Sequence, residues 1–279
     1  MDVCLCILGG QVKIVSWDEL IHGAQEATPS VATIGVFDGV HLGHRHLLHT
    51  MHSQWPELRR IVVTFSKSPK QIMRPQHYHG DISTLSQKLE KLEEAGADLC
   101  VLIDFSENFS KMAGENFIYS LMDFGAVQSF VVGWNFAFGH NLALQAKDLP
   151  ALAAQSGASA VLVDAIYIDG KPVSSSLIRS CIMKGRTDQA LAMLGYPYTL
   201  DLANYKIIRH KAGVQLVPAD SLYLPIGPGC YPVQVLTRRS RYTALLTVNE
   251  HNNMSWTSPS EEAPVRIEFN GNIEICNQD

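Results

Sequence analysis

The sequence predicts an α/β fold with a doubly wound parallel sheet, followed by a small all-β barrel domain. Two observations support this fold class. Before residue 198, apolar runs rich in Val and Ile alternate with longer segments of helical period. After that point, short β-branched and aromatic runs are broken by Gly and Pro. A chain of 279 residues typically forms about two domains, and we place them at 1–198 and 199–279.

The first domain is expected to alternate strands and helices. The expected strands are 31–36, 61–65, 99–103, 129–132 and 160–166, with a further short strand at 3–8. The expected helices are 44–55, 86–95, 113–124, 147–156, 175–184 and 187–194. Strands that are apolar throughout and separated by helices indicate a parallel sheet covered on both faces. Gly185 and Gly195 directly follow the last two helices, as is usual just past a helix end.

The second domain is expected to consist of short strands alone. They are 205–208, 215–217, 229–236, 242–248 and 265–269. Several short strands at close spacing are typical of a small barrel or sandwich.

Net charge and composition limit the classes of binding partner that we expect for this protein. A formal net charge of -5 argues against a protein that neutralises many phosphates along a nucleic acid, while a small nucleotide needs only a local site. The six cysteines form no CxxC pair, which predicts reduced thiols and a cytoplasmic location rather than a disulfide framework or a zinc site. The apolar run at 3–8 is far too short to cross a membrane, so we expect no membrane partner.

The first chemical motif lies at the end of the first strong strand and the start of its helix. Gly35, Gly39 and Gly43 allow tight turns and close approach of the backbone, and His41 and His44 stand three residues apart at the helix entrance. A helix that follows a parallel strand offers unpaired N–H groups to an anion. Paired imidazoles there can stabilise the charge that builds on a phosphate during in-line attack.

Other histidines follow the motif, at positions 46, 49 and 52. They indicate either a metal site or a solvated helix face. No carboxylate or thiol accompanies them at ligand spacing, which favours the solvated face, and no metal ligand is assigned.

The second motif opens the helix expected at 175–184. Ser174 or Ser175 alone would be an ordinary helix cap. Ser176 and Arg179 are three residues apart, so a hydroxyl and a guanidinium can converge on a polyphosphate from one helix face.

The two motifs together resemble the bacterial bifunctional riboflavin kinase/FAD synthetase family. GVFDGVHLGH at 35–44 is similar to the family's HxGH nucleotidyltransferase signature, and SSSLIR at 174–179 is similar to its SSTxIR segment. The resemblance continues through LSQKLEKL at 85–92, VGWNFAFG at 132–139 and LGYPY at 194–198. It implies a Rossmann-like, HUP-type domain that transfers AMP from MgATP to FMN, giving FAD and pyrophosphate without a covalent enzyme intermediate.

The resemblance also implies site residues. The catalytic set is His41, His44, Ser176 and Arg179. The ATP-binding set adds Gly35, Phe37, Asp38, Gly39, Gly43 and Ser175, and the flavin-binding set is Thr64, Phe65, Asn135, Phe136 and Phe138. Mg²⁺ is expected to accompany ATP, and ATP and FMN are the expected small-molecule partners.

Two segments depart from the family pattern. Where the family has TF(D/E)PHP, this chain has Ser66 in place of the acid and Ser68 in place of the histidine. Where the family has GxDFRFG, Asn135 replaces the aspartate and Ala137 the arginine. An Asn keeps hydrogen-bonding shape but supplies no carboxylate.

The second domain departs further from the family. LPIGPGCY at 224–231 is similar to the strand entry of the riboflavin kinase barrel, but the kinase's GxPTAN segment is missing. We therefore expect a kinase-like barrel without kinase activity. Glu261 and Glu262 are paired acids in a Ser/Pro-flanked stretch and are interpreted as a solvated loop.

Three functions fit the sequence. The leading one is an ATP-dependent FMN adenylyltransferase without riboflavin kinase activity. The second is a nucleotidyltransferase with another acceptor, because a fold alone does not fix a substrate. The third is a catalytically weakened nucleotide- or flavin-binding regulatory protein, which the substitutions in the two departing segments favour.

Overall fold

The structure is a computed structural model that describes residues 12–23, 27–105, 107–210, 213–218 and 224–271. The strand expected at 3–8 lies outside the described residues. The chain forms two compact units. The first contains Met1–Phe37, His44–Met73 and Leu89–Ala165, and the second contains Asp38–Gly43, Arg74–Lys88 and Ile166–Asp279. The domain limits 1–198 and 199–279 stay a prediction.

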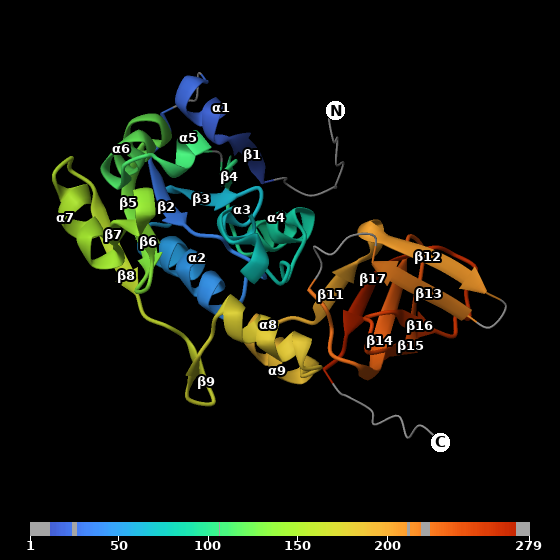
Figure 1. Cartoon of the computed structure of the whole chain (residues 1–279). Helices are drawn as coiled ribbons and strands as arrows, with labels where there is room; N and C mark the ends of the chain where they lie inside the picture. The colour runs from blue at the N-terminus through green and yellow to red at the C-terminus, as the bar shows by residue number, and fades with distance from the viewer. Residues whose placement is uncertain (1–11, 24–26, 106, 211–212, 219–223, 272–279) are drawn as a thin grey trace. The chain divides into compact units, whose positions relative to one another are not determined.

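A six-stranded parallel sheet is the centre of the first unit (Figure 1). Its spatial order is β1 (Lys13–Ser16), β4 (Leu99–Ile103), β3 (Arg59–Phe65), β2 (Ser30–Ile34), β5 (Val127–Gly133) and β8 (Ser159–Val163). All neighbouring strands pair in parallel. The doubly wound α/β fold is confirmed, and β1 adds an edge strand that the sequence did not predict.

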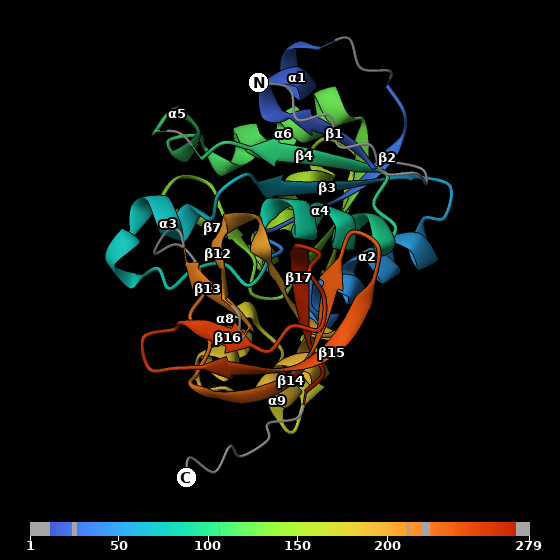
Figure 2. The same ribbon diagram turned by 90° about the vertical axis from the view of Figure 1, so that its right-hand side faces the viewer.

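Helices cover both faces of this sheet. They are α1 (Trp17–His22), α2 (Leu42–Gln54), α4 (Leu85–Glu94), α6 (Gly114–Gly125) and α7 (Leu149–Ala154). Buried side chains of α1, α6 and α7 share one apolar cluster with alternate residues of the strands. Figures 1 and 2 show α2 and α4 on the opposite side of the sheet. The short helices α3 (Pro69–Met73) and α5 (Glu107–Ser110) and the hairpin of β6 (Ala137–Phe138) and β7 (Leu144–Gln145) complete the unit.

Local sequence explains where two of these helices begin. Ser16 accepts a hydrogen bond from the Glu19 backbone N–H, and the Glu19 carboxylate accepts one from the Ser16 N–H. Thr84 and Gln87 exchange the same two bonds before α4. Each is a reciprocal capping box, which satisfies backbone N–H groups that the first turn leaves open.

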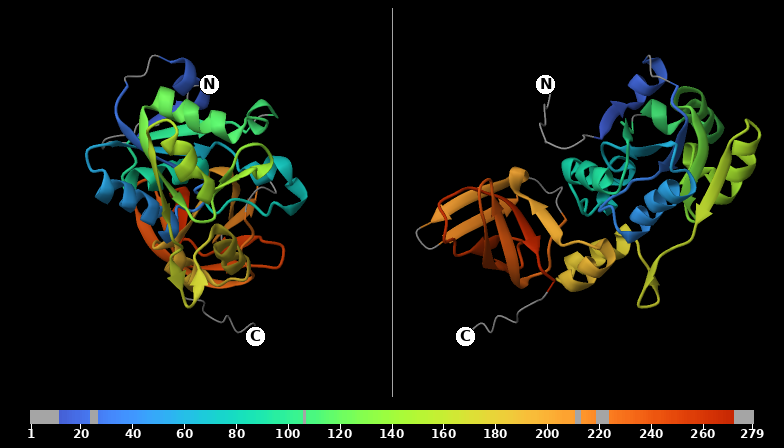
Figure 3. Two further views of the ribbon diagram at one scale, coloured as in Figure 1. Left: turned by 90° about the vertical axis from the view of Figure 1, so that its left-hand side faces the viewer. Right: turned by 180° about the vertical axis from the view of Figure 1, so that it is seen from behind.

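The second unit contains a curled seven-stranded antiparallel sheet, drawn in orange and red in Figure 3. Its order is β11 (Tyr198–Asp201), β17 (Pro264–Phe269), β14 (Gly229–Thr237), β15 (Arg241–Val248), β16 (Met254–Trp256), β13 (Gly213–Pro218) and β12 (Tyr205–His210). This confirms the small all-β barrel. Helices α8 (Ser175–Met183) and α9 (Thr187–Leu194) share one apolar core with it, and β9 (Tyr167–Ile168) and β10 (Lys171–Pro172) form a hairpin.

Among the described cysteines, Cys100 and Cys181 are buried, whereas Cys230 is disulfide-bonded. The expectation of reduced thiols throughout is therefore wrong for Cys230. Within the described residues, no helix has the length and apolar character needed to span a membrane.

Candidate functional site

The sheet of the first unit has a natural ligand edge. The chain runs from β2 outward through β3 to β4, and β5 and β8 then continue on the other side of β2. Ligands of doubly wound sheets bind outside the carboxyl ends of the strands at this switch point. The glycine and histidine motif begins at Gly35, directly after β2 ends at Ile34, and Asn135 follows β5 two residues after Gly133.

The backbone after β2 adopts conformations that side chains disfavour. Phe37 has φ of 53°, Gly39 of 76° and Val40 of 31°. Glycine takes positive φ without strain, but a β-branched residue such as Val40 rarely does. Strain of this kind persists only where surrounding contacts hold the backbone, and it is concentrated in functional loops. We call residues 35–44 the nucleotide loop.

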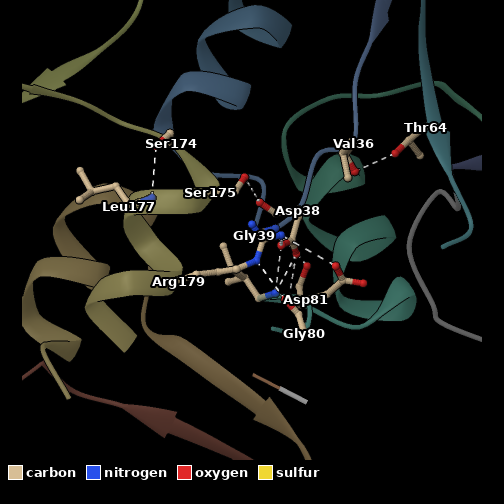
Figure 4. A network of polar contacts seen from close by, with 12 residues as sticks. Val36, Asp38, Gly39, Thr64, Gly80, Asp81, Ser174, Ser175, Leu177 and Arg179 are labelled. Atoms are coloured by element: carbon tan, nitrogen blue, oxygen red, sulfur yellow. Dashed lines mark hydrogen bonds and ion pairs between the residues drawn. The ribbon is translucent and has the colours of Figure 1, made fainter. Parts of the chain in front are cut away.

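Asp38 is the centre of a polar network in the second unit (Figure 4). Its carboxylate accepts backbone hydrogen bonds from Ile82 at 2.9 Å and from Ser83 at 3.2 Å. The Arg179 guanidinium donates to the same carboxylate at 2.5 Å, and its Nε donates to the Gly80 carbonyl at 3.0 Å. Burial raises the pKa of Asp38, and Arg179 and the two N–H groups oppose that rise.

Side chains also bind the backbone of the nucleotide loop. Ser175 Oγ donates to the Asp38 carbonyl at 3.0 Å, and the Tyr196 hydroxyl donates to the Gly39 carbonyl at 2.5 Å. The Gly39 N–H donates to Ser83 Oγ at 3.2 Å. Each peptide group around Gly39 therefore has a hydrogen-bond partner within the protein, which orders this part of the loop.

Close packing explains two of the loop glycines. A Cβ on Gly39 would lie 3.0 Å from Ile82 Cγ2, at a positive φ that already excludes most side chains. A Cβ on Gly43 would lie 3.2 Å from Cε1 of the His41 ring, closer than most real contacts of a Cβ. The positive φ at Gly39 favours glycine there, whereas a methyl at position 43 would press on the His41 ring.

The two motif histidines have different surroundings. His41 is only 6% exposed, and burial lowers the pKa of its imidazole from 6.5 to about 4. It is therefore neutral at pH 7, where it offers a hydrogen bond rather than a positive charge. His44 lies in the first turn of α2, with its ring 4.9 Å from the Phe37 ring. Convergence of both imidazoles on one phosphate stays a prediction.

The serines before α8 divide between two structural roles. Ser174 is the helix cap, accepting from the Leu177 N–H at 3.3 Å, and Ser175 holds the Asp38 carbonyl. Ser176 is exposed on the first turn of α8. Of the three, Ser176 alone has its side chain at the surface, where a ligand can reach it.

The predicted flavin residues lie in the first unit. Thr64 is buried and donates to the Val36 carbonyl at 3.0 Å, which ties β3 to the loop after β2. Phe65 packs edge-on against Phe105. Phe136 and Phe138 stack with centroids 5.1 Å apart, and Phe138 is buried whereas Asn135 is exposed. Asn135 and the half-buried Phe136 are thus the members of this set best placed to meet a ligand.

The described residues hold no group of three His, Cys, Asp or Glu side chains placed to bind a metal ion.

Sequence reasoning missed several residues that shape the loop. Ser83 and Tyr196 bind its backbone, and Gly80 and Ile82 complete the network around Asp38 and Arg179. Tyr196 belongs to the LGYPY segment, which carried the family resemblance but no assigned role. Nothing local in the sequence marks the segment 80–83.

The first unit is a doubly wound α/β unit with a glycine and histidine loop after its central strand, the arrangement that the sequence led us to expect of a nucleotidyltransferase-type domain. The family model described as FAD synthetase matches residues 23–177. The chain belongs to the FAD synthetase family.

Curated relatives carry the name bifunctional riboflavin kinase/FMN adenylyltransferase. The Bacillus subtilis protein is 30% identical over 178 residues, which is 62% of this chain and 56% of the relative. The Escherichia coli K12 protein is 27% identical over 185 residues, 64% of this chain and 59% of the relative. The match therefore spans little more than half the length of these relatives.

A solved structure supports the fold of the whole chain. The crystal structure described as a macrolide-efflux protein from Streptococcus pneumoniae has a TM-score of 0.84 and 21% sequence identity, covering 96% of this chain and 93% of its own. At this identity the likeness concerns the fold alone.

Proposed function

We propose that the protein is an ATP-dependent FMN adenylyltransferase. An oxygen of the FMN phosphate attacks the α-phosphorus of ATP, and the bond from that phosphorus to the bridging oxygen of the β-phosphate breaks. The products are FAD and pyrophosphate. The observation that carries the proposal is the strained nucleotide loop at the carboxyl end of β2, whose Asp38 and Gly39 carbonyls are held by hydrogen bonds, in a chain of the FAD synthetase family.

The proposed roles follow from the sequence motifs and from the exposure of each residue. His41, His44 and Ser176 are proposed to contact the ATP phosphates, with Gly35, Gly39 and Gly43 giving the backbone its close approach. Asn135 and Phe136 are proposed to meet the flavin from the end of β5. Mg²⁺ is proposed to arrive with ATP, where it would neutralise phosphate charge. Because both proposed substrates are intracellular metabolites, we propose a cytoplasmic location.

The second domain is proposed to lack riboflavin kinase activity, because no GxPTAN segment occurs in it. Its Glu262 carboxylate accepts hydrogen bonds from Thr237 at 2.5 Å and Ser240 at 3.2 Å, and so ties the loop before β17 to the turn between β14 and β15. This is a structural use of an acid that the sequence suggested was simply solvated.

A second candidate is a nucleotide-binding regulatory protein with little or no turnover. It is favoured by the neutral residues Asn135 and Ala137, which stand where the family pattern has charged ones. A nucleotidyltransferase with another acceptor is the remaining alternative.

One experiment separates these functions. Purified protein is incubated with MgATP and FMN, and FAD and pyrophosphate are measured by chromatography and by a coupled phosphate assay. We expect both products in equal amounts, and no FMN when riboflavin replaces FMN. ATP binding without either product would favour the regulatory protein, and pyrophosphate release with a different acceptor would favour the other transferase.

A further inference from the structure

Arg179 donates two hydrogen bonds into the protein. Its guanidinium donates to the Asp38 carboxylate at 2.5 Å, and its Nε donates to the Gly80 carbonyl at 3.0 Å. The side chains of Arg179 and Asp38 are 15% and 4% exposed. A second carboxylate oxygen, on Asp81, lies 3.9 Å from the same guanidinium.

Besides Arg179, Asp38 binds two other segments of the chain. The Asp38 carboxylate accepts hydrogen bonds from the backbone N–H groups of Ile82 and Ser83. The backbone carbonyl of Asp38 accepts one from the Ser175 hydroxyl on α8. Arg179, also on α8, thus joins the helix, the nucleotide loop and the segment 80–83 through one buried ion pair (Figure 4). Adjoining this ion pair is the part of the loop with positive φ at Gly39 and Val40.

We infer that Arg179 is a positioning residue, which holds the nucleotide loop through Asp38 and does not itself contact the phosphates of ATP. The inference rests on the proposed nucleotide site and assigns this arginine a different task from the one that its motif suggests. Moving Arg179 onto a phosphate would leave the Asp38 carboxylate buried without its cation, and such a loss is strongly unfavourable.

The variant Asp38→Asn distinguishes a positioning role of Arg179 from a phosphate-binding role, because the two roles predict opposite changes in the Kd for MgATP. The amide keeps the shape of the side chain and an oxygen for the backbone N–H groups, but it removes the negative charge that pairs with Arg179. If Arg179 positions the loop, the loop loosens, and we expect the Kd for MgATP to rise about tenfold. If Arg179 is a phosphate ligand, the released guanidinium should bind MgATP as tightly as before or more tightly.

The double variant adds a second criterion. Arg179→Gln should weaken MgATP binding about as much as Asp38→Asn, and Asp38→Asn/Arg179→Gln should be no weaker than the worse single variant, because both remove the same contact. The matched control is Arg186→Gln, which changes an exposed arginine just before α9. Calorimetry with MgATP measures all four variants and the parent.

A single variant at Tyr196 keeps the test valid if the charge variants fold poorly. Tyr196→Phe removes only the hydroxyl that holds the Gly39 carbonyl, and the exposed Tyr167→Phe is its control. We expect a fivefold to tenfold rise in Kd for MgATP with Tyr196→Phe alone.

Amide hydrogen exchange without any nucleotide separates this inference from the proposed function. If the parent protein binds no MgATP, the proposed function fails, and exchange alone then decides about Arg179. We expect the Ile82 and Ser83 amides to exchange about tenfold faster in Asp38→Asn and Arg179→Gln than in Arg186→Gln. Unchanged exchange at these amides, tighter MgATP binding by Asp38→Asn, or additive losses in the double variant would overturn the inference.

Discussion

The buried His41 predicts a specific loss of stability in acid. Burial lowers the pKa of its imidazole to about 4, against 6.5 for an ordinary histidine. At a pH between these two pKa values, His41 is protonated in the unfolded chain but neutral in the folded protein. The unfolding free energy therefore does not depend on His41 protonation above pH 6.5, and it decreases as the pH falls from 6.5 towards 4. At 1.36 kcal/mol per pKa unit, the loss from this residue is about 3 kcal/mol.

The assay is urea unfolding of the parent and of His41→Asn between pH 4 and 7.5. The asparagine does not titrate, so the difference in unfolding free energy between the two proteins should change by about 3 kcal/mol across this range. His49→Gln, which changes an exposed histidine of α2, is the control and should follow the parent. A parent and His41→Asn whose curves run parallel from pH 7.5 to 4 would refute the argument from burial.

Three further changes test the site and its supports. Gly43→Ala places a methyl 3.2 Å from Cε1 of His41, and we expect kcat/KM for FAD formation to fall about tenfold while the fold is kept. Thr84→Ala removes the cap of α4, and urea unfolding should show a loss of about 1 kcal/mol. Asn135→Asp with Ala137→Arg restores two charges of the family pattern and should raise kcat/KM for FMN at least tenfold, because one charged contact is typically worth about 1.5–3 kcal/mol. An unchanged value in a well-folded, ATP-binding double variant would count against FMN as the acceptor.

Much of the fold could be predicted because its elements are locally marked. The strand expected at 99–103 coincides with β4, and the helix expected at 187–194 coincides with α9, whose C-cap is Gly195. The strands β1 and β16 were missed because they have four and three residues, too few to show a period. They are strands because neighbours distant in sequence offer them a partner.

Only the part of the site that is encoded by residues close together in the sequence could be predicted. Glycine and histidine spacing located the nucleotide loop, but the contacts that fix it come from far along the chain. Ile82 is 44 positions from Asp38, Arg179 is 141, and Tyr196 is 157 positions from Gly39. No local pattern records such separations, and so the sequence suggested that Arg179 faces a ligand while the structure pairs it with Asp38.

The two segments that depart from the family pattern should respond differently to restoration. Asn135 is exposed, so a charge there remains solvated until a substrate binds. Ser66, by contrast, donates to the Ile103 carbonyl at 3.3 Å at the end of β4, and Ser68 is only 5% exposed. A carboxylate at 66 would face that carbonyl oxygen, and the larger imidazole at 68 would stand at a position that is already buried.

We therefore expect Ser66→Asp with Ser68→His to lower the unfolding free energy by about 1–3 kcal/mol and to gain no FAD synthesis. Urea unfolding and the FAD assay measure the two effects separately, with Ser66→Ala/Ser68→Ala as the control for simple loss of the hydroxyls. A pair that kept its stability and made FAD faster would mean that this segment can still accept the family's charges. The hydrogen bond of Ser66 and the burial of Ser68 argue instead that the end of β3 favours small neutral side chains.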